Sequence, residues 1–326
     1  MYLSLVRSAL LTICCLVLSP SVQAADYPTK PVTLIVPFAP GSSSDTSARL
    51  IAQSLSKSFG QPVVIENKVG AGGTIAATHV SRSKPDGYTL FWTSSSVQVI
   101  APFVMPDLSW DPVKSFIPIG LSSRLPQVIA VNSESPIKSF RELIDRAKAR
   151  PGDLNYATLG PNTTQNLIFT IIMNRTGFSM TQVPYTSAAQ IYPDLLSGRI
   201  DVMLDNLPNI LPFAQQGKLR PLAVTTRERV SVLPDTPTIA ELALPDFEMV
   251  AWGGMVVPAG TPTPIVATIS DALSEALKSK EYTEYLKATG SLPANEVGSE
   301  AFGAFLRQQL ELWKSAVQQT GVAVNK

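Results

Sequence analysis

A hydroxyl-rich loop follows the first β-branched run of the sequence, and its residue types suit the binding of an anion. Residues 32–37 are expected to form a strand, and a helical pattern runs over residues 45–59. Glycine lets the intervening backbone approach a ligand, and the helix start favours negative charge because its first amides have no acceptor within the helix. The candidate ligand contacts in this loop are Phe38, Pro40, Gly41, Ser42, Ser43, Ser44 and Asp45.

Structural roles compete with ligand binding in the same loop. Ser44 or Asp45 can cap the helix, and for Asp45 capping is the favoured interpretation. A phosphate-binding P-loop is excluded, because that motif ends in Gly-Lys-Ser/Thr and residues 37–45 contain no lysine.

A glycine-rich turn at residues 67–74 follows the second expected strand. Gly70 and Gly72 match the first two glycines of a dinucleotide-binding fingerprint, but Ile75 stands at the third, so nucleotide binding is disfavoured. The alternatives are a plain tight turn and a nest of backbone amides that binds an anion. The nest is favoured, and its candidate contacts are Gly72 and Gly73.

Polar loops also follow later strands. The loop after residues 88–93 either binds ligand or is an ordinary polar loop, and residues 160–164 lead into a helix whose N-terminus could hold the far end of a dicarboxylate. Asp205 follows a strand expected at residues 200–204, where capping and ligand contact have equal weight. The candidates in these loops are Ser94, Ser95, Asn162, Thr163, Thr164, Gln165 and Asp205.

Composition excludes several kinds of active site. His79 is the only histidine and is expected to pack within a helix, and both cysteines, Cys14 and Cys15, lie in the leading segment. The sequence therefore lacks the residues for a histidine-based triad, a thiol nucleophile or a zinc site, and no metal or cofactor is expected. The serine-rich loops leave an exported hydrolase using serine or aspartate as the competing interpretation.

Residues 1–24 have the features of a cleavable signal peptide. Arg7 precedes an apolar run at residues 9–18, and Val22 and Ala24 suit cleavage before Ala25. Cleavage removes one of the 26 basic residues and none of the 25 acidic ones, so the mature chain is close to neutral. Since Lys and Arg are not clustered, neither nucleic acid nor an anionic membrane surface is an expected partner.

The elements that position these loops follow a βαβ pattern. Short β-branched runs alternate with amphipathic stretches, which predicts an α/β fold with two domains and largely parallel sheets. A capping box, Ser139 to Glu142, opens a helix in the second domain. An apolar segment at residues 249–257 can return the chain to the first domain, and an amphipathic helix is expected over residues 299–319.

A series of short motifs resembles the periplasmic receptors of tripartite tricarboxylate transporters, also called Bug receptors. The resemblance spans nearly the whole mature chain, and the order and spacing of the motifs make it specific. Ser42 and Ser43 stand where the family usually has glycines, and Asn166 stands where a histidine is often found. The motifs lie at residues 27–31, 36–41 with Asp45, 70–73, 85–90, 183–185, 217–220, 222–225 and 233–238 with Glu241.

The resemblance implies a two-lobed venus-flytrap fold, in which each lobe is a mainly parallel sheet flanked by helices and crossing strands join the lobes. We expect residues 25–124 and 248–326 to form lobe 1 and residues 125–247 to form lobe 2. The implied protein is a periplasmic, monomeric solute-binding protein without enzymatic activity. It captures a mono-, di- or tricarboxylate or an acidic amino acid between the lobes and presents it to the membrane subunits of a transporter. A sensor that feeds a signalling partner is the alternative.

Overall fold

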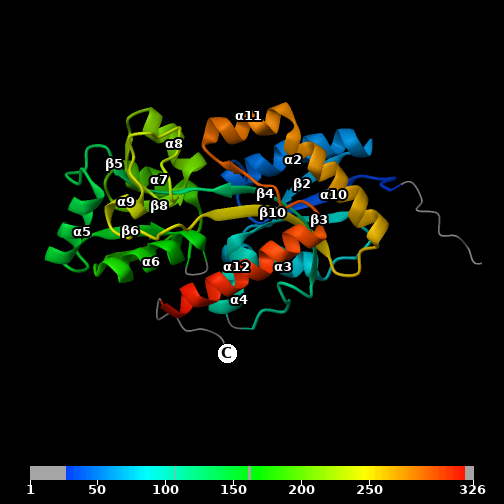
Figure 1. Cartoon of the computed structure of the whole chain (residues 1–326), viewed down its shortest axis with the longest axis horizontal. Coiled ribbons are helices and arrows are strands. Elements are labelled where there is room, and N and C mark those ends of the chain that lie inside the picture. Colours follow the sequence, from blue (N-terminus) through cyan, green and yellow to red (C-terminus); the bar gives the residue numbers. More distant parts are fainter. Residues whose placement is uncertain (1–26, 106, 161–162, 320–326) are drawn as a thin grey trace, which may run out of the picture.

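The computed structural model describes residues 27–105, 107–160 and 163–319, which form two lobes, each built around one β-sheet (Figure 1). The first lobe, mostly blue, cyan and orange in Figure 1, has the strand order β11-β4-β10-β3-β1-β2. The second lobe, mostly green, has the order β7-β6-β8-β5-β9. The strands are β1 (Val32–Val36), β2 (Val63–Asn67), β3 (Thr89–Ser94), β4 (Phe116–Leu125), β5 (Gln127–Asn132), β6 (Asn155–Thr158), β7 (Thr181–Pro184), β8 (Val202–Asn206), β9 (Leu219–Val224), β10 (Ala251–Pro258) and β11 (Leu292–Pro293).

Helices flank both sheets, and their ends carry the expected signals. Helices α2 and α6 end at Gly60 and Gly177, which adopt left-handed backbone angles with φ of 61° and 69°. The expected cap at Ser139 accepts a hydrogen bond from the amide of Glu142. The helical elements are α2 (Ser43–Phe59), η1 (Ala71–Gly73), α3 (Thr74–Ser81), η2 (Ser96–Ile100), α4 (Ala101–Val104), α5 (Phe140–Ala149), α6 (Thr164–Thr176), α7 (Ala188–Leu196), α8 (Leu207–Gln215), α9 (Ile239–Leu242), α10 (Thr263–Lys278), α11 (Lys280–Thr289) and α12 (Ser299–Gln319).

The two-lobed α/β architecture is confirmed, but the sheets are mixed and not mainly parallel as predicted. In the first sheet β1 is parallel to β2 and β3, whereas β10 is antiparallel to β3 and β4. In the second sheet β6 is parallel to β7 and β8, whereas β5 is antiparallel to β8 and β9. The antiparallel pairs involve the strands next to the crossings between the lobes, and residue periodicity does not encode strand direction there.

Two passages of chain join the lobes. Strand β4 of the first sheet leads into β5 of the second with only Pro126 between them. The chain returns after β9 through residues 225–250 into β10, which lies between β3 and β4 (Figure 1). Helix α12 contacts β4 and η2 in the first lobe and also α6 in the second. The two crossings and α12 therefore connect the lobes in the described part of the chain.

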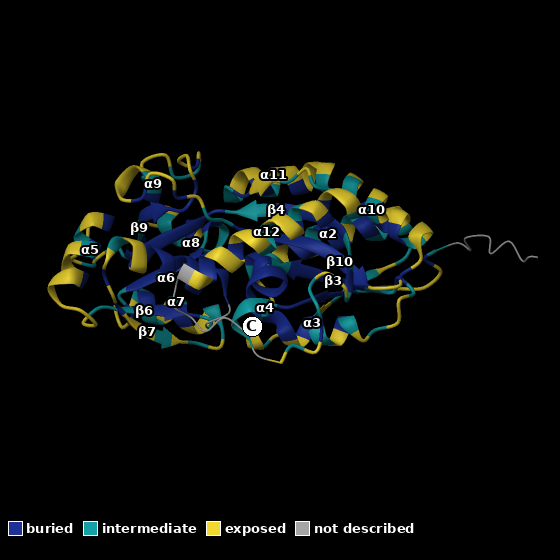
Figure 2. Cartoon of the chain, turned by 60° about the horizontal axis from the view of Figure 1, so that its bottom comes forward, coloured by how far each residue is buried: buried dark blue, intermediate teal, exposed yellow. Residues whose placement is uncertain are grey.

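Apolar side chains form a core in each lobe and a larger cluster that both lobes share. Ile51 and Leu55 of α2 pack with Leu34 in the first lobe. The shared cluster joins Phe91 of β3 with Phe169 of α6. Figure 2 shows the result, with buried sheets and helices exposed on their outer faces.

Some elements differ from the sequence-based expectations. The π-helix η2 and the short helix α4 follow β3, where the sequence predicted a polar loop. Helix α8 was not predicted, because Pro208 and Pro212 resemble helix breakers. Within the described ranges, no helix is both long and apolar enough to cross a bilayer. The expected signal peptide lies outside the described residues.

Candidate functional site

A cavity of about 110 Å³ lies between the lobes and is lined by residues of both. The first lobe contributes the β1–α2 loop, the end of β3 and parts of β4 and β10. The second lobe contributes the first turns of α6 and α7 and the β8–α8 junction. The loops after β1, β3, β6 and β8 therefore meet at one place, as the βαβ pattern predicts.

The first wall of the cavity is the start of α2. Its cap is Ser42, whose Oγ accepts a hydrogen bond from the Asp45 amide at 3.3 Å, so the expected cap by Ser44 or Asp45 is wrong. Ser42, Ser43 and Ser44 line the cavity together with Phe38. Because Ser42 is the cap, the side chains of the next two serines lie in the first helical turn, whose first amides have no acceptor within the helix backbone.

Asp45 does not line the cavity, but its carboxylate accepts hydrogen bonds that hold the β1–α2 loop in place. Its buried carboxylate accepts hydrogen bonds from the Gly41 amide at 2.9 Å, the Asn67 side chain at 2.8 Å and the Arg49 guanidinium at 2.8 Å. Burial raises the pKa of the Asp45 carboxyl, but the hydrogen bonds from Arg49, Asn67 and Gly41 outweigh that effect and lower it. Asp45 thus fixes the loop in its shape as an ionised group.

The second wall is the start of α6, which is capped by Thr163. Thr163 Oγ1 accepts a hydrogen bond from the Asn166 amide at 3.3 Å. Next to it, Thr164 contacts the first lobe: its Oγ1 lies 2.7 Å from Ser95 Oγ and 3.0 Å from Ser96 Oγ. The amide of Thr164 also donates to Ser96 Oγ at 3.0 Å. One side of the cavity is therefore closed by direct hydrogen bonds between the lobes.

A second bridge between the lobes centres on Ser43. Its amide donates to Asn209 Oδ1 at 3.1 Å, and its Oγ accepts from Asn206 Nδ2 at 3.2 Å. Tyr285 of α11 donates to the Ser43 carbonyl oxygen at 3.2 Å. With bridges at Thr164 and at Ser43, the structure is in a closed arrangement.

Asp205 lies in the cavity wall and organises the second bridge. Its carboxylate accepts hydrogen bonds from the Asn206 amide at 2.7 Å, Tyr192 OH at 2.8 Å, Asn209 Nδ2 at 3.0 Å and Gln165 Nε2 at 3.3 Å. Burial raises the pKa of Asp205 above its ordinary value, and these hydrogen bonds counteract only part of the rise. The carboxylate holds Asn206 and Asn209 where they can reach Ser43.

Two hydroxyls in the lining are free to bind a ligand. Ser94 Oγ and Ser122 Oγ are buried and have no hydrogen-bond partner among the described residues. A buried polar group without a partner is costly, so such groups mark places where a ligand or water completes the bonding. Trp92 and Trp252 also line the cavity and supply apolar surface.

The cavity brings together ten of the residues proposed from the sequence. Gly72 and Gly73 lie in the short 3-10 element η1, and a Cβ on Gly73 would lie 2.6 Å from Val97 Cγ2. Pro40 and Gly41 are exposed, and Asn162 lies outside the described residues. Pro40, Gly41, Asp45, Gly72 and Gly73 are not in the lining. The proposed residues that line the cavity are Phe38, Ser42, Ser43, Ser44, Ser94, Ser95, Thr163, Thr164, Gln165 and Asp205.

Sequence reasoning missed several lining residues. Thr186 and Ser187 lie between β7 and α7, so the rule that selected the other strand-to-helix loops could have found them. Asn206 and Asn209 were hidden because α8 was not predicted. Ser122 and Ser123 lie on the crossing strand β4, for which no loop signal exists.

The lining contains hydroxyl, amide and apolar groups, and Asp205 is its one charged side chain among the described residues. Across the same ranges, no group of His, Cys, Asp and Glu side chains is arranged to hold a metal ion. His79, which was expected to be packed, is exposed on α3 outside the cavity. The arrangement therefore offers neutral hydrogen-bond donors and helix N-termini to a ligand.

Comparison with known proteins assigns the family. Residues 47–322 match the family described as tripartite tricarboxylate transporter family receptor. The chain belongs to this receptor family. Members of the family are solute-binding receptors, so this receptor is not an enzyme.

Relatives of the receptor agree with this assignment. BugT of Bordetella pertussis strain Tohama I is 33% identical over 301 residues, which cover 92% of each chain. The structure of R. palustris Rpa4515 with adipate is 34% identical with a TM-score of 0.87, covering 91% of the receptor and 99% of that chain. MatC from Rhodopseudomonas palustris with bound malate is 32% identical with a TM-score of 0.84, and the match covers 89% of the receptor and 100% of the MatC chain.

Proposed function

We propose that this receptor captures a small carboxylate in the cavity between its lobes and presents it to the membrane subunits of a tripartite tricarboxylate transporter. The observation that carries the proposal is the cavity between the lobes, which the first turns of both α2 and α6 line with hydroxyl groups. Helix N-termini favour anions, and they do so without a cationic side chain. Rpa4515 with adipate and MatC with malate show that similar receptors accept organic acids.

Binding and closure are coupled in this proposal. Ligand contacts come from both lobes, so a bound acid stabilises the closed form more than an open one. Ser94 Oγ and Ser122 Oγ donate to the acid from the first lobe, and Thr163, Thr164 and Gln165 contribute from the second. The class of ligand comprises mono-, di- and tricarboxylates and acidic amino acids.

The family assignment also supports a proposed setting for the receptor. We propose that residues 1–24 are removed as a signal peptide and that the mature receptor works in the periplasm as a monomer, without a cofactor. We also propose that the lobes comprise residues 25–124 with 248–326 and residues 125–247. The first set contains β10 and all of β4 except Leu125, and these are the strands that meet the crossings.

A thermal-shift screen of the purified receptor with mono-, di- and tricarboxylates and acidic amino acids tests the function. A ligand that binds the folded state raises the unfolding temperature, and calorimetry then gives its affinity. The recovered acid should be chemically unchanged. If no compound of this class stabilises the receptor, the proposed ligand class is wrong.

A pair of variants locates the binding site. Ser44→Phe places a bulky ring in the cavity lining and should abolish binding while the protein stays folded. Ser58→Phe is the control, because Ser58 is exposed near the end of the same helix. Equal affinity in the two variants would remove this cavity from the mechanism.

A further inference from the structure

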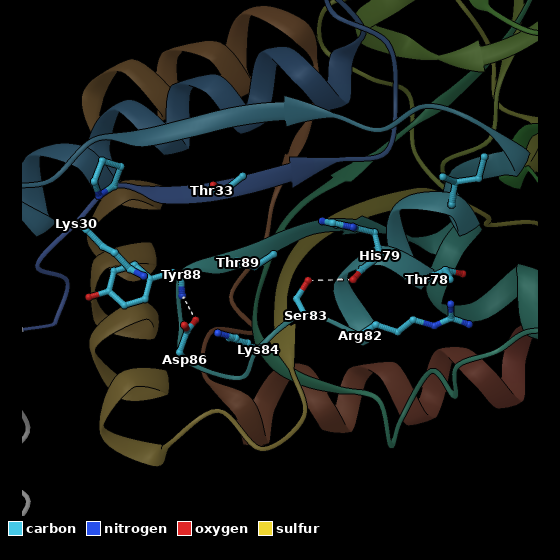
Figure 3. A pocket seen from close by; sticks show the side chains of 12 residues that line it. Lys30, Thr33, Thr78, His79, Arg82, Ser83, Lys84, Asp86, Tyr88 and Thr89 are labelled. Carbon is cyan, nitrogen blue, oxygen red and sulfur yellow. Dashed lines mark hydrogen bonds between the residues drawn. The ribbon is translucent and has the colours of Figure 1, made fainter.

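A second hollow lies on the first lobe, away from the ligand cavity, and its rim is basic. It has a volume of about 820 Å³ and lies beside the starts of β1 and β3 and the end of α3. Figure 3 shows Lys30 on one side, Arg82 on the other and Lys84 between them. We call this hollow the basic groove.

The basic groove exists because α3 covers only part of its face of the sheet. Ala76, Ala77 and Val80 of this eight-residue helix belong to the same cluster as Ile35 and Phe91. Thr33 lies two residues before Ile35 on β1, and Thr89 lies two residues before Phe91 on β3. These two threonines are paired in register, and they line the groove. Both uncovered positions thus carry a hydroxyl where the covered ones carry apolar side chains, as suits a floor that meets a polar partner.

The charges in the basic groove are unbalanced. Lys30, Arg82 and Lys84 are exposed, and within the described part of the chain none of them forms an ion pair. Lys30 lies over the Tyr88 ring, with its Nζ 4.3 Å from the ring centroid. The one acidic residue of the lining, Asp86, accepts a hydrogen bond from the Tyr88 amide at 3.1 Å. Three cations and one anion leave a net charge of +2 here, against +1 for the whole chain.

We propose that the basic groove docks an extended acidic segment of a partner protein. The three cations are spread along the groove, so they match a chain of carboxylates better than a single small anion. Ile75, which is 52% exposed and lines the groove, provides an apolar contact for the same segment. A flat lipid surface would touch the rim and leave the threonine floor unused.

Docking in the basic groove is independent of ligand capture, and in this respect it goes beyond the proposed function. Every lining residue lies between residues 30 and 89, in the first lobe. The groove lies at the amino ends of β1 and β3, whereas the ligand cavity lies beyond their carboxyl ends. Opening and closing of the lobes therefore leaves the groove unchanged, and the partner can hold the receptor in both states.

A labelled deca-glutamate peptide is the probe for this surface. Fluorescence anisotropy with the full mature receptor should show saturable binding that weakens as salt is added, because the contacts are exposed ion pairs. The triple variant Lys30→Gln, Arg82→Gln, Lys84→Gln should bind the peptide at least about tenfold more weakly than the unmodified receptor. The control is Lys57→Gln, Lys114→Gln, Lys148→Gln, which removes three exposed lysines outside the groove and should bind as the unmodified receptor does.

Other outcomes overturn the proposal. Equal loss in both triple variants would show attraction by net charge alone, and no loss in either would show that the basic groove is not used. Complete competition by millimolar inorganic phosphate would indicate a small-anion site, and tighter groove-dependent binding to vesicles with phosphatidylglycerol would indicate a lipid surface. Unfolding curves confirm that each variant is folded. The thermal-shift response to carboxylates is measured in parallel, so failure of docking and failure of ligand capture remain distinguishable.

Discussion

At the scale of single residues, two buried aspartates have different tasks: Asp45 lies in the first turn of α2, and Asp205 lies within β8. Asp45 is held by Arg49, Asn67 and the Gly41 amide, and its pKa is lowered. Asp205 receives only neutral donors, and its pKa is raised by burial. Asp45 therefore contributes to stability as an anion, whereas Asp205 is costly as an anion and is retained where it positions the interlobe bridge.

Asp45→Asn should reduce the free energy of unfolding at neutral pH by about 2 kcal/mol, because buried donors lose a charged acceptor. The pKa of Asp45 is lower in the folded protein than in the unfolded chain. Its contribution to folding stability is therefore complete above the ordinary aspartate pKa and is lost as the pH falls through the folded-state pKa. Urea unfolding at pH 7 and pH 3 should therefore show a smaller loss on acidification in the variant. Asp145→Asn, at an exposed position on α5, is the control and should keep the full loss.

Ser94→Ala should weaken carboxylate binding by about tenfold without lowering stability, because the hydroxyl has no protein partner among the described residues. Ser56→Ala should instead lower stability and leave carboxylate binding unchanged. Ser56 Oγ donates to the Ala52 carbonyl at 2.7 Å and accepts from the Val63 amide at 2.8 Å, so its loss costs stability far from the cavity. Calorimetric titration and urea unfolding of both variants separate the two effects, and matching profiles would argue against a ligand role for Ser94.

The sequence predicted the site residues that depend on position in a βαβ unit. Ser43, Ser94, Thr164 and Asp205 could be proposed because strand-to-helix loops gather at one edge of a sheet. The sequence did not reveal which loop residue caps α2, since several serines in a row are chemically equivalent candidates. It also did not reveal Ser122, because its place in the cavity depends on how β4 crosses between the lobes.

At the scale of elements, the long amphipathic helices and most strands were predictable, and the exceptions have physical causes. Helix α8 tolerates Pro208 because a first-turn residue needs no amide donor, so a residue that resembles a breaker in fact starts the helix. The π-helix η2 is a rare local geometry that places Ser96 against Thr164, a contact with a distant segment. The start of α8 is thus explained by local backbone chemistry, whereas η2 is explained by a tertiary contact.

The end of α11 packs closely against the second lobe, and this contact limits how far the lobes can close. Gly290 has a φ of 69°, and a Cβ there would lie 2.5 Å from Leu207 Cδ2 and 2.5 Å from Val232 Cγ2 in the second lobe. Gly290→Ala should therefore separate the lobes, lowering the free energy of unfolding by about 3 kcal/mol and weakening ligand binding.

Gly177→Ala is the matched control for this substitution. Gly177 caps α6 with the same φ of 69°, but no atom lies within 4 Å of the new Cβ. This variant should lose only about 1–2 kcal/mol from backbone strain, with its affinity unchanged. If calorimetric titration gave equal affinities for the two variants, the contact at Gly290 would not control closure.

At the scale of the whole molecule, two bridges of neutral hydrogen bonds hold the lobes together around the cavity. Thr164→Val removes the hydroxyl that contacts Ser95 and Ser96, with little change in volume. Ligand dissociation measured by stopped flow should accelerate by about tenfold. Thr170→Val is the control, because the Thr170 hydroxyl donates within α6 to the Asn166 carbonyl, and an equal acceleration there would contradict a role for the bridge.

The apolar cluster that joins Phe91, Phe169 and Trp313 has a further consequence for heating. Neither lobe can melt alone without exposing part of this cluster to water, so the two lobes should lose their structure together. Scanning calorimetry should give a single heat-absorption peak whose calorimetric and van't Hoff enthalpies agree. Two resolved peaks would mean that the lobes behave as separate cooperative units despite their common interior.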